Sequence, residues 1–368
     1  TFTTLPYADR TAIMLADLHD LDGSRWAAGP RARLREYLAE IGEAGYESRL
    51  AFESEFYYTD ETDDGEVVPF DETPCFSTAG MQSAHDLVLE TVDALKAQGM
   101  GLAAYYPEYG PGQQELVVDH DAGVTASDTQ ILFKETVRAV AAAHDVGVTF
   151  RPKPFDGLPG TGCHVHLSVW QDGENVLYDP EAEGRYPLSD RGRHFVGGLL
   201  EHAPALVALT APTVESYDRL APGMWSSAYT CWGHDNREAA VRVPSVRADD
   251  PAATTRIEFK PSDNTNNPYL AQLGLLAAGI DGIDREIDPG EPLNRDPSGI
   301  DDDALADRGI ERLPDSLAAA LDALESDDVL AAALGEPLHR SYLEVKRSEW
   351  EQSTEDGEWE SAYLARSF

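Results

Sequence analysis

Cysteine, lysine and long apolar runs are all scarce in this chain. Its three cysteines, Cys75, Cys163 and Cys231, are too few and too scattered for a disulfide framework or a zinc ribbon, which fits a reducing, cytoplasmic environment. No run approaches the roughly 18–20 uninterrupted apolar residues that span a bilayer. The first residues show neither the basic nor the apolar region of a secretory signal. These absences favour a globular cytoplasmic protein of 368 residues, long enough for one large domain or two ordinary ones.

Positive charge is also scarce. The chain has 28 Lys and Arg against 67 Asp and Glu, for a formal net charge of −39. DNA, RNA and anionic membranes repel such a polyanion, so we expect no nucleic-acid and no membrane partner. The acids are dispersed along the chain, for example at 60–64, 249–250 and 301–303, which is typical of a halophile. Molar salt screens such self-repulsion over about 3 Å. Because acids are abundant along the whole chain, functional acids must be identified from their positions in sequence patterns.

Periodicity predicts an α+β fold with a curved, largely antiparallel sheet and helices packed outside it. Helical patterns cover 29–44, 79–99, 126–146, 190–210, 264–284, 315–334 and 337–353. Strand patterns cover 48–58, 101–109, 114–119, 147–152, 163–171, 238–244 and 254–260. Several strands follow one another too closely for crossover helices, which argues against a regular parallel array.

Three of these strands carry a polar row on one face. Residues two apart in a strand share a face, which pairs Glu53 with Glu55 in an apolar segment. The same alternation groups His164, His166 and Ser168 in one strand, and Arg256, Glu258 and Lys260 in another. Glu108 and Glu115 flank a tight connection that would bring both to one end of a hairpin. For Glu53 and Glu55 alone, a solvent-exposed face would be the simpler interpretation. Together, the three rows favour a charged cavity.

Five carboxylates and one imidazole suit Mg²⁺ or Mn²⁺ better than zinc or copper. The Gly-rich stretch 153–162 is not a Walker loop, because no Gly-Lys-Ser/Thr closes it. Arg219, Arg237 and Arg242 fall in loops or at strand edges, where arginine contacts phosphate or carboxylate. Metals with clustered arginines are typical of phosphoryl transfer. A nucleophilic Cys163 is the weaker alternative, since alternation aims it away from the histidines.

Six motifs follow one another in order along the chain. They are Glu53-Ser-Glu55, the segment from Glu108 to Glu115, Lys153-Pro154 with Gly162-Cys-His164-Val-His166-Leu-Ser168, 215–223, 236–244, and Arg256-Ile-Glu258 followed by 267–270. From about residue 29 to the C-terminus, the chain with these motifs resembles the glutamine synthetase family. We therefore expect a catalytic ligase domain at 29–368. Residues 1–28 resemble only the last hairpin of the family's small N-terminal β-domain. The family's active sites lie between subunits, which implies a homo-oligomeric ring.

The resemblance implies that ATP phosphorylates the γ-carboxylate of glutamate and that an amine then displaces phosphate. The roles that it implies are one metal at Glu55, Glu108 and Glu115; a second at Glu53, His164 and Glu258; phosphoryl stabilisation by Arg219 and Arg237; ATP binding by His166, Ser168, Arg242 and Arg256; and substrate binding by Gly160, Lys260 and Trp225.

Some positions depart from the family pattern. Trp225 stands where ammonia-using members have a Glu that closes the site, and Lys260 stands where an Arg is expected. Pro159 and Glu215 replace two asparagines. The run 232–237 looks more like that of γ-glutamyl-amide synthetases. We therefore expect an amine other than ammonia, with glutamine synthetase proper and a non-catalytic scaffold or sensor as the alternatives.

Overall fold

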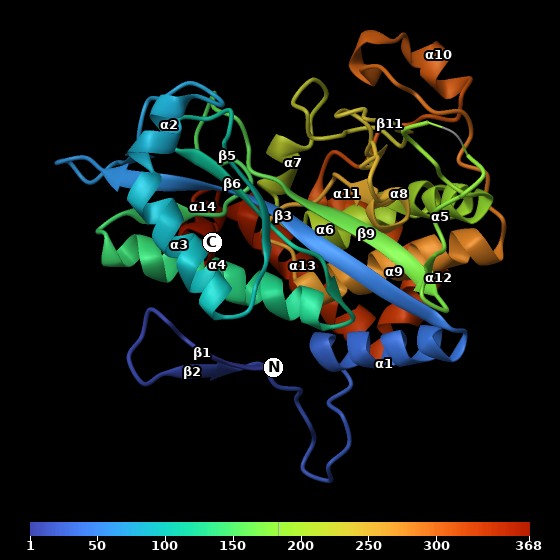
Figure 1. The fold of residues 1–368 in the computed structure, drawn as a ribbon, viewed down its shortest axis with the longest axis horizontal. Helices are drawn as coiled ribbons and strands as arrows, with labels where there is room; N and C mark the ends of the chain where they lie inside the picture. Colours follow the sequence, from blue (N-terminus) through green and yellow to red (C-terminus); the bar gives the residue numbers. More distant parts are fainter. Residues whose placement is uncertain (183) are drawn as a thin grey trace.

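The computed structural model describes residues 1–182 and 184–368 and is built around one long curved sheet (Figure 1). Its strands are β1 (Phe2–Thr4), β2 (Ala12–Met14), β3 (Tyr46–Glu61), β4 (Val67–Pro69), β5 (Leu102–Pro107), β6 (Gln113–Val118), β7 (Asp121–Ala122), β8 (Gly147–Thr149), β9 (Cys163–Gln171), β10 (Glu174–Asn175), β11 (Trp232–His234), β12 (Val241–Val243) and β13 (Ile257–Phe259). Its helices are α1 (Pro30–Glu43), α2 (Thr78–Ser83), α3 (His85–Ala97), α4 (Thr125–Ala143), α5 (Asp190–Glu201), α6 (Ala203–Thr210), α7 (Ser216–Arg219), α8 (Pro251–Thr254), α9 (Pro268–Asp284), the 3₁₀ turn η1 (Pro297–Gly299), α10 (Asp302–Ala306), α11 (Leu317–Ser326), α12 (Asp328–Leu334), α13 (Glu336–Glu355) and α14 (Trp359–Ser367).

The main sheet has eleven strands, and β3 and β9 form its spine. The path runs β11-β12-β13-β9-β3-β6-β5, while β4, β7 and β8 pair with β3, and β10 pairs with β9. Every pair is antiparallel except β11 with β12. The register places Glu53 opposite His164 and Glu55 opposite Glu115. The predicted α+β fold with a largely antiparallel sheet is confirmed.

Side-chain alternation divides the sheet into an apolar and a polar face. Phe52, Val165 and Ile257 point to one side and join a core cluster with α5, α6 and α9. Phe56 and Leu116, farther along the sheet, join a second cluster with α3 and α4. Helices therefore cover this face in Figure 1, and the acids and histidines that alternate with these residues are left on the other face.

Three predicted helices are interrupted in the structure. The pattern over 190–210 breaks at His202, because Pro204 lies in the first turn of α6 and cannot donate a hydrogen bond to α5. The pattern over 315–334 breaks where the Asp327 carboxylate accepts the Leu330 N–H and starts α12. The pattern over 79–99 divides at Ala84 into α2 and α3.

Three predicted strands are shortened to three residues each. The segment 147–152 yields only β8. The segment 238–244 yields only β12, and the segment 254–260 yields only β13, because the helix α8 ends at Thr254. The β1–β2 hairpin lies outside the main sheet and packs against the second cluster through Ile13 and Leu15. The domain division at residue 28 stays a prediction. Among the described residues, no helix is both long and apolar enough to cross a membrane.

Candidate active site

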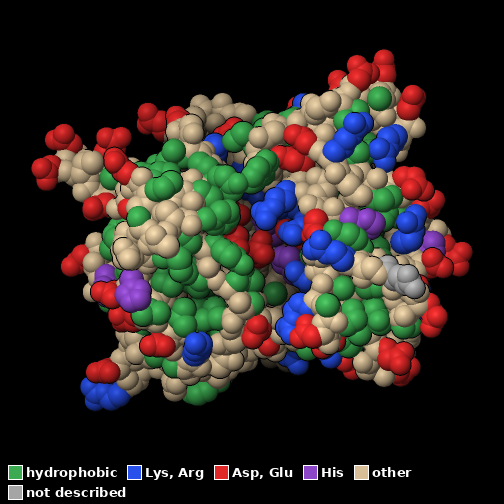
Figure 2. All heavy atoms as spheres, turned by 45° about the horizontal axis from the view of Figure 1, so that its top comes forward, with side chains coloured by type: hydrophobic (Ala, Val, Ile, Leu, Met, Phe, Trp, Pro, Cys, Tyr) green, Lys and Arg blue, Asp and Glu red, His purple; other side chains and the backbone are tan. Residues whose placement is uncertain are grey.

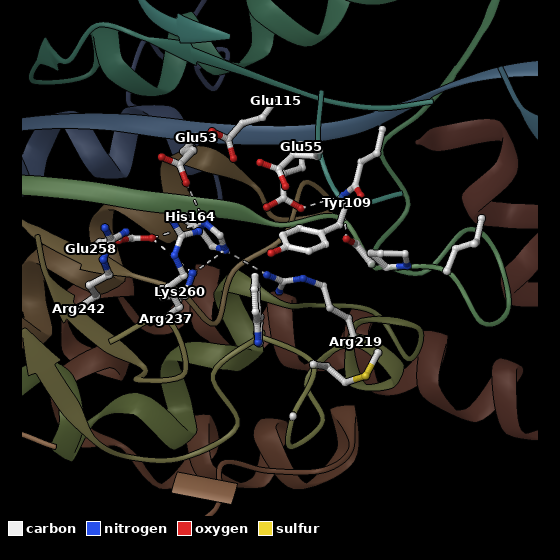
Figure 3. Close-up of a pocket in the computed structure, with 18 of the residues that line it drawn as sticks. Glu53, Glu55, Tyr109, Glu115, His164, Arg219, Arg237, Arg242, Glu258 and Lys260 are labelled. Atoms are coloured by element: carbon white, nitrogen blue, oxygen red, sulfur yellow. Dashed lines mark hydrogen bonds and ion pairs between the residues drawn. The ribbon is translucent and has the colours of Figure 1, made fainter. Parts of the chain in front are cut away.

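The polar face of the sheet lines a cavity of about 330 Å³ (Figure 3). β3, β6, β9 and β13 supply one wall, and the loops at 157–160 and 223–225 complete the lining. Figure 2 shows acids spread around the surface, whereas Lys, Arg and His side chains gather in a central hollow. The cavity therefore concentrates cationic side chains beside a group of carboxylates that the sheet holds together.

All six predicted metal ligands line this cavity. Glu53 and Glu55 come from β3, Glu115 from β6, His164 from β9 and Glu258 from β13, while Glu108 follows β5. The hairpin of β5 and β6 brings Glu108 near Glu115, as the connection between them suggested. Long-range pairing of four strands thus places side chains up to 205 positions apart around one space.

His164 lies at the centre of a hydrogen-bonded group. Its Nδ1 is 3.0 Å from Glu53 Oε1 and 3.5 Å from Glu258 Oε1. Lys260 Nζ lies 3.2 Å and Arg219 Nη2 3.4 Å from its Nε2. Since both of these cations are donors, Nε2 accepts and Nδ1 donates to Glu53. Burial, reinforced by Lys260, lowers the pKa of His164, so the ring is neutral, as a metal ligand must be.

The other carboxylates repel one another. Burial raises the pKa of Glu115 to about 10, with additional repulsion from Glu53 and Glu55. Burial and the Glu55 charge raise the pKa of Glu108 to about 7. Divalent cations would relieve this repulsion, and carboxylate oxygens with one neutral imidazole form a suitable donor set. Glu53, His164 and Glu258 also present donor atoms within 4.8 Å of one another. The residues present therefore fit divalent metal binding.

Arg219 and Arg237 enter the cavity from the side opposite the sheet (Figure 3). The Nη1 atom of Arg219 is buried and has no partner among the described protein atoms. A Cβ on Gly160 would lie 2.6 Å from the Pro152 carbonyl and 3.0 Å from Arg219 Cγ, so only glycine allows this approach. A cavity-lining guanidinium with a donor that has no partner among the described residues suits an anionic ligand.

Of the four predicted ATP-binding residues, Arg242 lines the cavity and the other three lie beside it. Arg242 lines the cavity and donates to Glu258 Oε2 at 2.6 Å. His166 lies next to the cavity, 3.1 Å from Glu53 Oε2, and its Nδ1 accepts from Arg256 Nε at 3.1 Å. Ser168 is farther along β9, where its Oγ accepts the Trp170 indole N–H at 2.9 Å. The sheet thus continues beyond the cavity as a polar strip.

Gly160, Lys260 and Trp225, predicted to bind substrate, all line the cavity. Lys260 is buried 3.5 Å from Glu258, so its ammonium is held among the acids. Trp225 is half-exposed at the mouth, and its ring meets Tyr109 edge-on with the centroids 4.8 Å apart. The structure therefore separates a charged interior from an aromatic entrance.

Sequence reasoning missed three cavity-side residues. Gln113 donates to Glu55 Oε2 at 3.1 Å and to the Gly160 carbonyl at 3.0 Å, and alternation with Glu115 could have identified it. The exposure of Tyr109 and the contact of Glu238 with the Trp225 N–H have no signal in the sequence. The weaker alternative, a nucleophilic Cys163, is not supported, because this thiol is buried in the core with its pKa raised by burial to about 12.

A cavity in which a largely antiparallel sheet gathers five glutamates and a neutral histidine, and in which Arg219 and Arg237 face them from the opposite side, defines a metal-dependent enzyme for anionic substrates. The model of the glutamine synthetase catalytic domain matches residues 27–363, and the chain belongs to this family.

Curated and structural relatives agree with this assignment. Glutamine synthetase of Halobacterium salinarum is 38% identical over all of this chain and 82% of its own length. The Methanocaldococcus jannaschii enzyme is 38% identical over 98% of this chain and 80% of its own length. A solved structure described as a novel glutamine synthase homolog covers 96% of this chain and 79% of its own, at 35% identity and a TM-score of 0.82. GmaS with ADP covers 96% and 81%, at 31% identity and a TM-score of 0.85. The chain is an ATP-dependent ligase that forms C–N bonds, and its likeness to a Halobacterium enzyme supports the halophilic interpretation.

Proposed function

We propose that this ligase joins the γ-carboxylate of glutamate to an organic amine and not to ammonia. The observation that carries the proposal is Trp225 at the cavity mouth, half-exposed and packed on Tyr109. Ammonium capture calls for negative charge close to a small cation, which an indole does not supply. Aromatic surface instead favours hydrocarbon, at about 25 cal/mol per Å² buried, and a cation–π contact can add about 0.5–2 kcal/mol.

In the proposed reaction, the γ-phosphoryl group of ATP moves to the glutamate carboxylate and ADP leaves. The amine nitrogen then attacks the acyl carbon, phosphate departs and the nitrogen loses a proton. Arg219 and Arg237 stabilise the transferring group, and the buried Nη1 of Arg219, which has no partner in the described part of the chain, supports this role. Gly160 gives the amino acid access beside Arg219, and His166, Ser168, Arg242 and Arg256 bind the nucleotide.

Two groups of residues hold Mg²⁺ or Mn²⁺ in this proposal: Glu55, Glu108 and Glu115 near the acceptor carboxylate, and Glu53, His164 and Glu258 near the phosphates. When bound, the metals neutralise charge on the carboxylates and phosphates. The raised pKa values of Glu108 and Glu115 and the clustering around His164 support this division.

Glutamine synthetase proper is the second candidate, because curated relatives at 38% identity carry that name. The two candidates differ in the acceptor nitrogen alone. Phosphate release in high salt, with ATP, Mg²⁺, glutamate and either ammonia or a panel of amines, separates them. We expect a higher kcat/KM for at least one organic amine than for ammonia.

Substitution of Trp225 tests whether this indole at the cavity mouth selects an organic amine. Trp225→Glu should shift the amine-to-ammonia ratio of kcat/KM toward ammonia by about tenfold or more, because it places a carboxylate at the entrance. Trp225→Ala should weaken the organic amine without improving ammonia. Trp26→Ala, which removes a similarly exposed indole outside the cavity, is the matched control and should leave the ratio unchanged. A wild-type enzyme that uses ammonia best and ignores every amine would establish glutamine synthetase instead.

A further inference from the structure

A row of exposed aromatic rings continues outward from the cavity. The Trp225 and Tyr109 rings have centroids 4.8 Å apart, Tyr109 and Phe76 5.9 Å, and Phe76 and Tyr106 6.1 Å. The four residues are between 44% and 53% exposed, and a contiguous row of exposed apolar side chains commonly marks an interaction site. Only Tyr109 and Trp225 line the cavity, so the row leads from its mouth to the outer surface.

Both neighbours of Tyr109 in the row, Phe76 and Trp225, have a strained backbone that hydrogen bonds hold in place. Phe76 has a φ of 52° and Trp225 a φ of 56°, in the left-handed region that bulky residues avoid. The Phe76 N–H donates to the Pro107 carbonyl at 3.0 Å, and the Trp225 N–H donates to Glu238 Oε1 at 2.9 Å. Glu238 is buried, so the fold places a carboxylate behind a surface loop to fix this conformation. Strain of this kind persists where the surrounding structure enforces it, commonly at ligand sites.

The row offers apolar and π surface but little charge. Its rings come from three separate segments, and each neighbouring pair meets edge-to-face, which leaves ring surface free. Figure 2 shows hydrophobic side chains gathered along one side of the central hollow. A molecule whose reacting end lies in the cavity would rest any apolar extension on these rings. Ammonia has no such extension.

We infer that Phe76, Tyr106, Tyr109 and Trp225 form a subsite for the substituent of the amine substrate. The preferred amine therefore carries an aryl group or a hydrocarbon group of comparable size. This inference rests on the proposed function, because it requires an organic amine as acceptor. Tyr109 and Trp225 contact the part nearest the nitrogen, and Phe76 and Tyr106 contact the distal part.

The test compares phenethylamine, methylamine, 1,4-diaminobutane and ammonium chloride as acceptors for the full chain in molar KCl. The wild type should use phenethylamine with a kcat/KM about tenfold above that for methylamine. Phe76→Ala should reduce the phenethylamine value about fivefold while methylamine and the KM for ATP stay within about twofold. Phe76→Tyr should retain most of the preference. Tyr363→Ala, a similarly exposed ring on α14, should change nothing.

Each contrary result has a distinct meaning. Equal use of phenethylamine and methylamine, both above ammonia, would overturn the subsite and leave the proposed function standing. Ammonia as the only acceptor would overturn both. If the enzyme prefers 1,4-diaminobutane and Phe76→Ala removes that preference, the row binds the second ammonium group of a diamine. This result would contradict the proposal that the row binds an apolar substituent. If Phe76→Ala lowers kcat/KM equally for every acceptor and also changes the oligomeric state in gel filtration, the row is a contact between subunits and the subsite is contradicted.

Discussion

Glu258 contacts three of the basic side chains of the cavity. It is buried and lies 2.6 Å from Arg242 Nη1 and 3.5 Å from both Lys260 Nζ and His164 Nδ1. Burial opposes its ionisation, but Lys260, His166 and Arg242 outweigh burial and hold its pKa at about 2. The carboxylate is therefore ionised at neutral pH, both as a proposed metal ligand and as the partner of Arg242.

Glu258→Gln keeps the shape of this side chain and removes its charge. We expect ATP-dependent phosphate release to fall about 100-fold or more, because a preorganised charge is lost where phosphate charge develops. Binding of Mn²⁺ should weaken in parallel. The variant should remain folded, since Arg242 keeps its contact with Asp235, and Glu258→Ala should likewise lose turnover while the fold survives. Thermal unfolding and circular dichroism check the fold.

Glu40→Gln is the matched control, because it removes an exposed carboxylate that pairs with Arg33 on α1. It should leave turnover and Mn²⁺ binding at the wild-type level. Wild-type turnover by Glu258→Gln would contradict the assigned role.

At the scale of elements, the breaks between helices are as informative as the helices themselves. His202, between α5 and α6, lies with its Nδ1 2.6 Å from Asp327 at the start of α12 and its Nε2 3.1 Å from Asp281 of α9. Arg285 contacts Asp281 at 2.8 Å and Glu201 at 2.6 Å. Burial would lower the pKa of His202, but the bonds to Asp327 and Asp281 outweigh it and raise this pKa. One imidazolium thus connects four helices.

This connection predicts a pH-dependent contribution to stability. Because the pKa of His202 is higher in the folded state, its contribution is fully present below the unfolded value of about 6.5 and is lost as the pH rises through the folded value. His202→Gln should therefore lower the Tm by roughly 2–4 °C at pH 6, and by less at pH 9. Thermal unfolding across this range checks the sign. His144→Gln, which removes a more exposed pair with Glu90, should have a smaller effect. A His202→Gln deficit that grew with pH would contradict the assignment.

At the scale of the whole molecule, the acids of the cavity and the acids of the surface have different surroundings. The interior carboxylates face His164, Lys260, Arg219 and Arg242, whereas the acidic segments 60–66 and 301–303 lie on exposed surface. With 67 Asp and Glu against 28 Lys and Arg, the basic side chains are too few to pair with every acid. Assembly into a ring would bring such surfaces together and stays a prediction.

The unbalanced charge predicts a steep dependence of stability on salt. Raising KCl from about 0.1 M to molar strength shortens the screening length from about 10 Å to about 3 Å, which weakens repulsion among exposed acids. We expect the Tm to rise by about 10 °C or more. Replacing the acids at 60–64 and 301–303 with Asn or Gln should reduce this dependence. A Tm that is the same in dilute and molar salt would contradict the halophilic interpretation of the surface.

Sequence alone determined what depends on local periodicity and on residue type. Alternation placed Glu53 and Glu55 on one face of a strand, and His164 and His166 on another, because a strand repeats every two residues whatever surrounds it. The same reasoning directed Cys163 into the core. Motif order indicated the family, and the net charge indicated the surface. The polar residues that each strand contributes to the cavity could therefore be predicted from the sequence.

Tertiary structure decided what depends on register and on loop conformation. Only the pairing of β3 with β6 and β9 places Glu55 against Glu115 and Glu53 against His164, because register follows from packing of the whole sheet. The left-handed backbone of Phe76 and Trp225 is unfavourable for both residues and exists because distant partners, Pro107 and Glu238, hold it. Contacts between segments far apart in the chain created the aromatic row, and no local pattern encodes them.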